Sequence, residues 1–221
     1  MELEQSGASV FPKPIRGRIS NFVGSAEAAD RLRSLAAYRS AKTIFVNPDA
    51  AQLAVRELAL RDGKLLIIAT PKLREGFILL KPSRIKDSRE AASIGGAFKH
   101  GGRADISGRK VDLIVEGSVA VDRKGGRLGK GGGFGDLEFA ILRELRAAHE
   151  DTPIVTTVHP IQIVDEVPMS KYDMSIDFIV TLGLIIRAQR VKSKPSGTFW
   201  EFLPADALKL MPIIVELRER K

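Results

Sequence analysis

Short, continuous apolar runs alternate along the chain with longer segments whose apolar residues recur every three or four positions. Apolar runs bounded by turn residues are typical of buried strands, and the longer periodic segments are typical of amphipathic helices. The pattern predicts strands at 42–46, 64–69, 111–116, 153–158 and 178–181. It predicts helices at 25–35, 52–61 and 86–100, and another from Asp136 onward.

The first two strands enclose one helix, 52–61, and this order predicts a right-handed crossover in a parallel sheet. The turn at 47–49 then lies at the carboxyl edge of the first strand, where α/β folds bind ligands. The strand at 111–116 is apolar through most of its length, as in a central strand buried on both faces. The whole pattern predicts a three-layer α/β/α sandwich with a mostly parallel sheet.

The two ends of the chain carry weaker patterns. Residues 1–24 are rich in proline and glycine and predict an irregular basic arm, so that 25–221 would form a single α/β domain. Residues 200–203 predict a hydrophobic strand. Residues 207–221 alternate apolar and charged positions and either pack on the domain or fray into solvent.

Composition narrows the functional classes. The chain has 221 residues, 44% of them hydrophobic and 28% charged, as in ordinary globular proteins. It has no cysteine, which excludes disulfides, thiolate zinc sites and cysteine nucleophiles, and its 3 histidines disfavour a multi-histidine metal site. No apolar run approaches the roughly 18 residues of a membrane span. The N-terminus is acidic and polar, unlike a signal peptide, so we expect a cytoplasmic protein.

The charge balance is strongly basic. A net charge of +8 and a pI near 9.8 fit a polyanionic ligand, such as a nucleic acid or a nucleotide, and fit a generally basic soluble protein equally well. Aromatic residues make up only 6% of the chain, which argues against a platform that stacks bases of single-stranded nucleic acid.

The strongest candidate for chemistry is the stretch 125–135, in which seven of eleven residues are glycine. Lys124, Arg127 and Lys130 add positive charge, and Asp136 opens the helix that follows. A strand, a glycine-rich basic loop and a helix N-terminus in this order cradle phosphate, because glycine permits close approach and free N–H groups point at the anion. Asp136 would hold a Mg²⁺ that bridges phosphates, since hard cations bind carboxylate and phosphate oxygens.

A simpler interpretation of the same stretch is a flexible surface loop, followed by an aspartate that only caps the helix. The loop is not a Walker A motif, because no Gly-Lys-Ser/Thr follows at the required spacing, and its alternating glycines do not form a Rossmann fingerprint. The residues alone leave both interpretations open.

The run Arg127-Leu128-Gly129-Lys130-Gly131-Gly132-Gly133-Phe134-Gly135-Asp136 resembles the RLGxGxGYYD signature of the 5-formyltetrahydrofolate cyclo-ligase family. Softer matches are the Val167-Pro168, Asp173 and Asp177 segment, similar to the family's VP…D…D, and 11–16 with 47–49, similar to the methenyltetrahydrofolate synthase domain-containing branch. The resemblance covers about residues 11–190. It implies a Rossmann-like sheet and an ATP- and Mg²⁺-dependent conversion of 5-formyltetrahydrofolate to 5,10-methenyltetrahydrofolate, with ADP and phosphate released.

The resemblance also implies roles for the basic residues. Lys130 and Arg127 would be the catalytic cations that neutralise the transferred phosphoryl group. Arg16, or alternatively Arg18, would reach the nucleotide phosphates from the N-terminal arm, although a solvated basic arm explains the same residues. The implied nucleotide-binding residues are Arg16, Arg127, Leu128, Gly129, Lys130, Gly131, Gly132, Gly133, Phe134 and Gly135.

The acidic residues and one histidine complete the candidate site. The resemblance implies that Asp173 joins Asp136 as the second magnesium ligand and leaves Asp177 in a structural role. His159 follows a predicted strand, where it would serve as an acid or base or, more simply, as a packed histidine near a turn.

Two departures separate this chain from the family pattern. Gly135 replaces the second aromatic residue of the signature, and the glutamate that follows the family's first strand is replaced here by Asn47 or Asp49, of which Asp49 is more simply a helix cap. The phosphate half of the site is thus better kept than the folate half. Two alternatives follow: a nucleotide-binding relative with another substrate or no catalysis, and a basic RNA-associated binding module. Either would act as a monomer or a homodimer.

Overall fold

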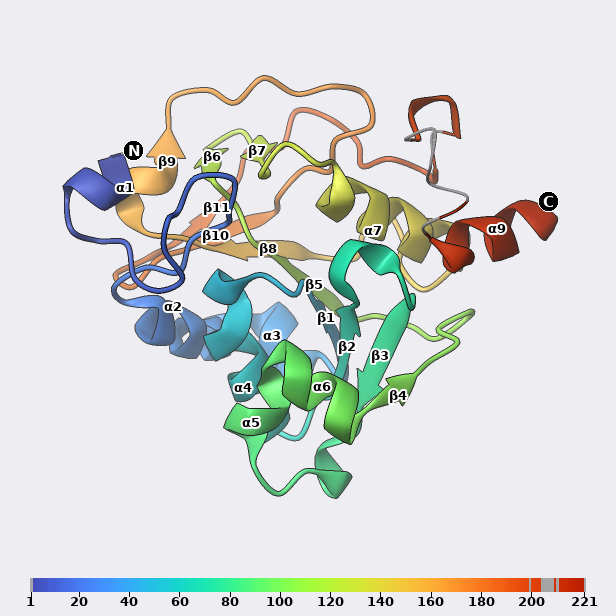
Figure 1. Ribbon diagram of the computed structural model, residues 1–221. Coiled ribbons are helices and arrows are strands. Elements are labelled where there is room, and N and C mark those ends of the chain that lie inside the picture. The colour runs from blue at the N-terminus through green and yellow to red at the C-terminus, as the bar shows by residue number, and fades with distance from the viewer. Residues whose placement is uncertain (1, 199, 204–208, 210, 221) are drawn as a thin grey trace.

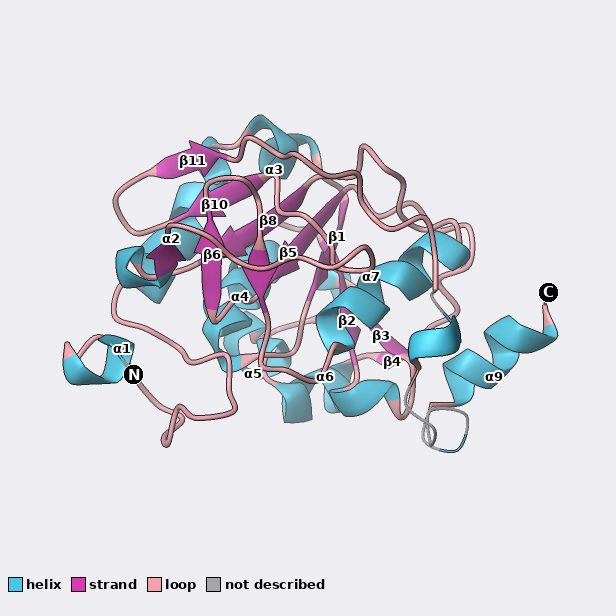
Figure 2. Cartoon of the chain, turned by 90° about the horizontal axis from the view of Figure 1, so that it is seen from above, coloured by secondary structure: helices cyan, strands magenta, loops and turns pink. Residues whose placement is uncertain are grey.

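The computed structural model describes residues 2–198, 200–203, 209 and 211–220. Its described strands form an eight-stranded sheet in the order β11-β10-β8-β5-β1-β2-β3-β4 (Figures 1 and 2). The five central strands are parallel: β1 (Thr43–Val46), β2 (Leu65–Ala69), β5 (Leu113–Glu116), β8 (Ile154–Thr157) and β10 (Phe178–Val180). Antiparallel strands complete the edges: β11 (Ile185–Arg187), β3 (Phe77–Leu80) and β4 (Gly102–Arg103).

Helices cover both faces of this sheet, which confirms the three-layer α/β/α sandwich (Figure 1). One face carries α2 (Ser25–Arg31), α3 (Ala36–Ser40), α4 (Leu53–Arg61), α5 (Ser88–Ala92) and α6 (Ile94–His100). The other carries α7 (Phe134–Glu144) and α9 (Pro212–Glu219). A short helix α1 (Glu2–Gln5) lies at the N-terminus beside a second sheet of β7 (Arg127–Leu128), β6 (Ala120–Asp122) and β9 (Ile163–Val164). Short 3-10 helices span Leu32–Ser34, Ala50–Gln52, Pro71–Leu73, Pro82–Arg84, Pro160–Gln162 and Trp200–Phe202.

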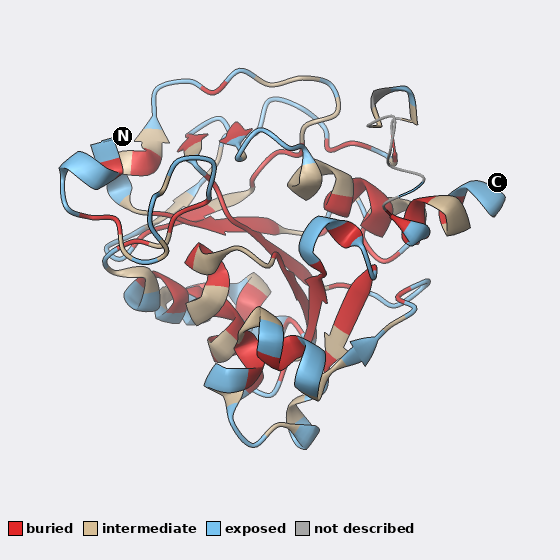
Figure 3. Ribbon diagram, viewed as in Figure 1, coloured by how far each residue is buried: buried red, intermediate tan, exposed pale blue. Residues whose placement is uncertain are grey.

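The hydrophobic core is divided by the sheet into two clusters. Phe45, Ile67 and Ile114 pack with α7 and α9, whereas Ile44 and Leu66 pack with α2 to α6. Successive residues of a strand point to opposite faces, so a strand between two helical layers must be apolar at every position. This explains the continuous apolar runs of the central strands, which are buried along their length (Figure 3).

The strand order creates a binding crevice in the middle of the sheet. β1 has β2 on one side and β5 on the other, so the connections that leave these strands run to opposite faces of the sheet. In doubly wound sheets, ligands bind at the carboxyl ends of the strands where the order reverses. Here that point is next to Val46 and Glu116, the last residues of β1 and β5.

The five predicted strands and the first two predicted helices are confirmed, and β1 and β2 pair in parallel as the crossover requires. The helix predicted at 86–100 is two helices, because Ser93 ends α5 and caps α6 by accepting a hydrogen bond from the Gly96 N–H. Strand β3 was missed, since its two flanking prolines suggested a loop. Helix α2 begins at Ser25, and Gly24 occupies the position before it.

Of the two predictions for the C-terminal part of the chain, one is wrong and one agrees with the structure. Residues 200–202 form a 3-10 helix rather than a strand, so that prediction is wrong. Helix α9 buries Ile213, Ile214 and Leu217 against the body, as a tail packed on the domain requires. Residues 207, 208, 210 and 221 of the alternating tail lie outside the described residues. No helix among the described residues is both long enough and apolar enough to cross a bilayer.

The N-terminal arm is attached to the body by its own small hydrophobic cluster. The cluster contains Leu3, Ala8, Ile19 and Phe22 of the arm. These residues pack with Ala28 of α2 and with Ala51 of the 3-10 helix that follows β1. A single antiparallel bridge joins Ser9 to Phe22 and closes the arm on itself. The arm's basic residues Arg16 and Arg18 are exposed and lie directly before the buried anchor residue Ile19.

Arg56 of α4 fixes the loop that follows β1. Its side chain is only 2% exposed and donates to the carbonyl oxygens of Asn47 at 2.7 Å, Asp49 at 3.0 Å and Ala92 at 2.7 Å. Burial lowers the pKa of its guanidinium to about 10. A buried cation that satisfies three carbonyl groups holds the loop at the carboxyl end of β1 in one conformation.

We expect Arg56→Ala to lower the free energy of unfolding by about 3–5 kcal/mol, because it leaves three carbonyl groups unpaired beside a cavity. Urea denaturation followed by circular dichroism measures this change. Arg56→Lys keeps the charge without the planar fork and should lower the free energy of unfolding by less than Arg56→Ala does. A loss below about 1 kcal/mol for Arg56→Ala would contradict the assigned role.

Candidate active site

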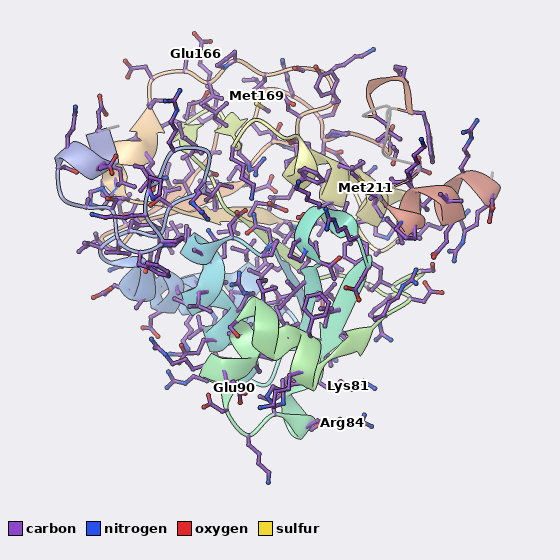
Figure 4. The ribbon with its side chains drawn as sticks, viewed as in Figure 1. Lys81, Arg84, Glu90, Glu166, Met169 and Met211 are labelled. Atoms are coloured by element: carbon purple, nitrogen blue, oxygen red, sulfur yellow. The ribbon has the colours of Figure 1, made fainter. Side chains whose placement is uncertain are left out.

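The glycine-rich stretch begins in a hairpin that one buried aspartate holds together. Asp122 of β6 accepts hydrogen bonds from the N–H groups of Lys124 at 2.8 Å, Gly126 at 2.9 Å and Val167 at 2.7 Å. The first two bonds form the turn between β6 and β7, and the third ties that turn to the loop after β9. The N–H of Arg127 also points to Met169 Sδ, at 3.4 Å, on the same loop (Figure 4).

The loop then enters α7 in the order that binds anions. Gly133, with φ of 65°, occupies the position that caps the helix, and Phe134 is the first helical residue. A left-handed backbone at this point suits glycine. Asp136 consequently lies in the first turn, so the interpretation of Asp136 as the helix cap is wrong. Its Oδ1 instead accepts from the Met174 N–H at 3.0 Å.

Arg127 is buried beneath the loop and joins three elements. Its Nε donates to the Gly117 carbonyl at 2.9 Å, and its two terminal nitrogens lie 3.7 Å from Glu116 Oε2 and 3.5 Å from Asp136 Oδ2. The guanidinium is thus committed to the end of β5 and the start of α7. In the folded protein Arg127 positions these carboxylates, whereas Lys130 is the more accessible cation, with its side chain 38% exposed.

Lys130 crosses from the loop to the end of β1. Its Nζ lies 2.6 Å from Asp49 Oδ1, and Asp49 Oδ2 accepts from Asn47 Nδ2 at 3.1 Å. The expectation that Asp49 caps the next helix is wrong: it occupies the cap position of the 3-10 helix Ala50–Gln52, but its side chain accepts no hydrogen bond from that helix. Its carboxylate instead forms an ion pair with Lys130, which is distant in the sequence.

A cavity of about 940 Å³ lies between the arm, the small sheet and the loop. Arg16 and Arg18 line it from the arm, and Gly129 and Lys130 line it from the loop. The structure therefore brings Arg16 and Lys130, which are 114 positions apart in the sequence, to one cavity. Two arginines and a lysine line this cavity together with Glu2 and Glu4, and the three cations are of the kind that bind a polyphosphate.

A smaller cavity of about 320 Å³ lies on the other side of the loop. Gly131, Gly132, Gly133, Phe134, Asp136 and Asp173 contribute to its wall. The loop thus divides the predicted site residues: Arg16 and Lys130 line the large cavity, Asp136 and Asp173 line the small one, and Arg127 is buried and lines neither. Leu128 lies between them on β7, with its side chain exposed.

The donor set of the small cavity fits magnesium. Burial raises the pKa of Asp136, the Arg127 charge opposes this rise, and the neighbouring Asp173 adds to it. Mg²⁺ typically takes one or two carboxylates and completes its coordination with phosphate oxygens and water. No group of three or more histidine, cysteine or acidic residues among the described residues could form a full metal cage. Asp136 and Asp173 therefore suit a metal that arrives with phosphates.

Asp177 and His159 have structural contacts. Asp177 Oδ2 accepts from Lys194 Nζ at 2.6 Å and from the Ile154 N–H at 2.8 Å, which joins β8 to the chain after β11. His159 Nδ1 accepts from the Ile161 N–H at 3.3 Å, and its ring packs edge-on against Phe22. These contacts confirm the structural interpretation of Asp177 and the packed interpretation of His159.

A steric constraint explains why position 135 is glycine. A Cβ atom at this position would lie 2.7 Å from an Arg127 terminal nitrogen and 3.1 Å from Glu116 Oε2. The space that an aromatic side chain would need is occupied by the pair of Arg127 and Glu116. The change from aromatic to glycine and the buried glutamate on β5 therefore belong to one arrangement.

Two buried glutamates of the site were missed from the sequence. Glu116 ends β5 and accepts from Asn47 Nδ2 at 2.9 Å, and Glu138 lies on the buried side of α7. Burial raises the pKa of both carboxyl groups, in Glu116 to about 8, against the attraction of Arg127. Both had a signal in the sequence: Glu116 directly follows the apolar run Leu113-Ile114-Val115, and Glu138 shares the apolar face of Ile141 and Leu142.

Comparison with known proteins confirms the resemblance of the glycine-rich stretch. The model of the 5-formyltetrahydrofolate cyclo-ligase family matches residues 10–182. The methenyltetrahydrofolate synthase domain-containing protein of Mus musculus is 39% identical over 226 residues, which cover 99% of this chain and 61% of the mouse protein. The Homo sapiens protein of the same name is 35% identical and is covered to 59%. The chain thus spans between 59% and 61% of the length of these two relatives.

Shorter and structural matches agree. The 5-formyltetrahydrofolate cyclo-ligase of Mycolicibacterium smegmatis is 32% identical over 72 residues, 33% of this chain and 34% of that protein. The solved 5,10-methenyltetrahydrofolate synthetase of Aquifex aeolicus superposes with a TM-score of 0.50 at 19% identity, covering 91% of this chain and 98% of that one. At that identity the superposition supports a common fold.

The raised pKa of Glu116 predicts a pH-dependent stability. The folded protein keeps its Glu116 proton up to about pH 8, whereas the unfolded chain releases it near pH 4.5, so stability falls as pH rises through this window. We expect wild type to lose up to ~1.4 kcal/mol per pH unit relative to Glu116→Gln. Urea denaturation across that range measures this difference. Glu75→Gln, on an exposed side chain, should follow wild type. Parallel curves for wild type and Glu116→Gln would contradict the burial of an ionisable proton at this position.

Proposed function

The chain belongs to the 5-formyltetrahydrofolate cyclo-ligase family, and from this we propose that it closes 5-formyltetrahydrofolate to 5,10-methenyltetrahydrofolate, with ATP converted to ADP and phosphate. The observation that carries the proposal is the meeting of Arg16, Gly129 and Lys130 on one cavity of about 940 Å³, beside the N-terminus of α7. A cavity of this size accommodates a nucleotide-sized ligand.

The cations have distinct proposed roles. Lys130 exchanges its contact with Asp49 for a phosphate oxygen, because both partners are anions and the lysine side chain is long and partly exposed. Arg16 binds the same polyphosphate from the arm, where its planar fork suits two phosphate oxygens. The N–H groups at the start of α7 and the glycine backbone add donors without side chains in the way. Arg127 acts indirectly, by holding Asp136 in position.

Asp136 and Asp173 are the residues that would hold Mg²⁺. When bound, the metal neutralises charge on the phosphates and orients them. The ion pair between Arg127 and Asp136 keeps that carboxylate available in the first turn of α7, despite the burial that raises its pKa. Asp173 is fixed in turn by the Ser170 N–H, which donates to its Oδ2 at 2.6 Å.

The chemistry needs positioning and charge neutralisation rather than a protein nucleophile. The formyl oxygen of the substrate attacks the γ-phosphorus of ATP and ADP leaves, which converts that oxygen into part of a phosphate leaving group. N10 of the folate then attacks the former formyl carbon, loses its proton and expels phosphate, which closes the ring. Cations and aligned N–H groups stabilise the charge that develops on the transferred phosphoryl group. A chain without cysteine can support this reaction.

One observation favours a second candidate, a nucleotide-binding relative that acts on another substrate. Gly135 leaves no aromatic side chain at the second position of the signature, and Arg127 with Glu116 occupies that space. The family's activity and this alternative share the phosphate site and differ in the ring that is bound. The reaction product therefore distinguishes them.

We expect absorbance in the methenyltetrahydrofolate band to rise when the protein is mixed with 5-formyltetrahydrofolate, ATP and Mg²⁺, and to stay flat without ATP or with a chelator. Lys130→Ala should reduce kcat/KM about 10- to 100-fold, because it removes a charge-assisted contact with the phosphates. Lys81→Ala, at the opposite end of the molecule, is the matched control and should behave as wild type (Figure 4).

Each outcome of this assay is decisive in a different way. No rise with wild type, while ATP binding remains measurable by calorimetry, would reject the cyclo-ligase reaction and favour another substrate. A rise that Lys130→Ala leaves unchanged would reject the assigned role of Lys130.

A further inference from the structure

Four buried side chains at the carboxyl ends of β1 and β5 each leave one polar atom without a hydrogen-bond partner among the described residues. These atoms are Glu116 Oε1, Glu138 Oε2, Asn47 Oδ1 and Gln52 Nε2. The four residues are between 0% and 4% exposed. Buried polar groups are normally paired, so several unpaired atoms in one place are a recognised mark of a site that a ligand completes.

The four side chains are neighbours. Asn47 Nδ2 donates to Glu116 Oε2 at 2.9 Å. A Cβ atom on Gly117 would lie 3.4 Å from both Asn47 Nδ2 and Gln52 Nε2. Glu138 lies one turn of α7 after Gly135, where a Cβ atom would be 3.1 Å from Glu116 Oε2, and the Glu116 charge helps to raise the pKa of Glu138. The unpaired atoms thus belong to one polar cluster, formed by residues of β5, α7 and the loop after β1.

The cluster is also fixed in orientation. Glu116 uses its other carboxylate oxygen on Asn47, and Gln52 uses its amide oxygen to accept from Thr157 Oγ1 at 2.8 Å. Rotating either side chain to pair its remaining atom would break an existing hydrogen bond. The backbone behind Asn47 is in turn held by Arg56, at 2.7 Å. These atoms are therefore preorganised to meet a ligand.

The large cavity comes close to this cluster. Val119, three residues after Glu116, lines it, as does Gln162, whose Nε2 donates to the Ser118 carbonyl at 2.8 Å. Lys130 lines the same cavity and lies within electrostatic range of Glu138. The polar cluster therefore lies behind the wall of the large cavity that Val119, Gln162 and Lys130 help to form.

The unpaired atoms define the chemistry of the ligand. Three of the four are oxygens and one is an amide N–H that donates; a carboxyl group that keeps its proton still accepts hydrogen bonds through its carbonyl oxygen. We propose that Glu116 and Glu138, with Asn47 and Gln52, bind the edge of a nitrogen heterocycle that carries an amide N–H and an amino group side by side. This inference rests on the proposed function, because it assigns the ring of the reacting substrate to these residues.

The test compares two fluorescent probes that differ at one position. Pterin carries an amide N–H beside an amino group, and lumazine has a carbonyl oxygen in place of that amino group. Fluorescence anisotropy measures the affinity of each probe for wild type, Glu116→Gln, Glu138→Gln and the exposed control Glu75→Gln. Calorimetry with Mg-ATP on the same four proteins reports on the phosphate site, and thermal melting reports on the fold.

We expect wild type and Glu75→Gln to bind pterin about tenfold or more tightly than lumazine, since a site built to accept N–H donors rejects an analogue that lacks one. Glu116→Gln and Glu138→Gln should each weaken pterin binding about 10- to 100-fold, and Glu138→Gln, which leaves the pair of Arg127 and Glu116 intact, should keep Mg-ATP affinity within about twofold of wild type. If Glu116→Gln melts far below wild type, Glu138→Gln alone decides the outcome.

Equal affinity of wild type for the two probes, or pterin binding that both variants retain, would overturn the proposed pocket. The result for the pocket is separable from the proposed reaction. Glutamate-dependent pterin binding without methenyl formation would reject the reaction and keep the pocket. Methenyl formation with an unchanged KM for 5-formyltetrahydrofolate in both glutamine variants would keep the reaction and reject the pocket.

Discussion

The arrangement of the site depends on one buried cation. Arg127 places a guanidinium between Glu116 at the end of β5 and Asp136 at the start of α7, and its Nε is bound to the Gly117 carbonyl. Two carboxylates buried this close to each other would repel without it, and burial alone already raises the pKa of both. The glycine-rich loop enters α7 in its present course because Arg127 compensates the charges beneath it.

The position of this charge cluster follows from the topology. A parallel sheet whose order reverses beside β1 collects the ends of β1 and β5 at one crevice, and the loop before α7 closes over them. Because Gly135 has no side chain, Arg127 and Glu116 can lie against the first turn of α7. One set of contacts therefore separates the partly exposed Lys130, where we propose that phosphates bind, from the buried Glu138, where we propose that the ring binds.

Local patterns in the sequence predicted much of this structure. The apolar runs predicted the five central strands, because both faces of those strands are covered, and the glycine stretch predicted a loop that enters a helix. Contacts between distant positions could not be read in the same way. Asp49 looked like a helix cap, yet it pairs with Lys130 across 81 residues, and Arg127 looked like a free phosphate ligand, yet it is buried. From the sequence, Glu116 was only an unexplained charge at the end of an apolar strand. Its role could not be predicted, because it depends on which loop packs above it.

A double-mutant cycle on Arg127→Met and Glu116→Gln tests this dependence most directly, with the free energy of unfolding measured near pH 9, where Glu116 is ionised. Arg127→Met leaves the buried Glu116 and the partly buried Asp136 without a compensating charge and should cost about 3–5 kcal/mol. Removing the Glu116 charge as well should recover at least ~1 kcal/mol of that loss relative to additivity. Losses that add within about 0.5 kcal/mol would show that the two groups do not interact, and that Arg127 does not organise the site.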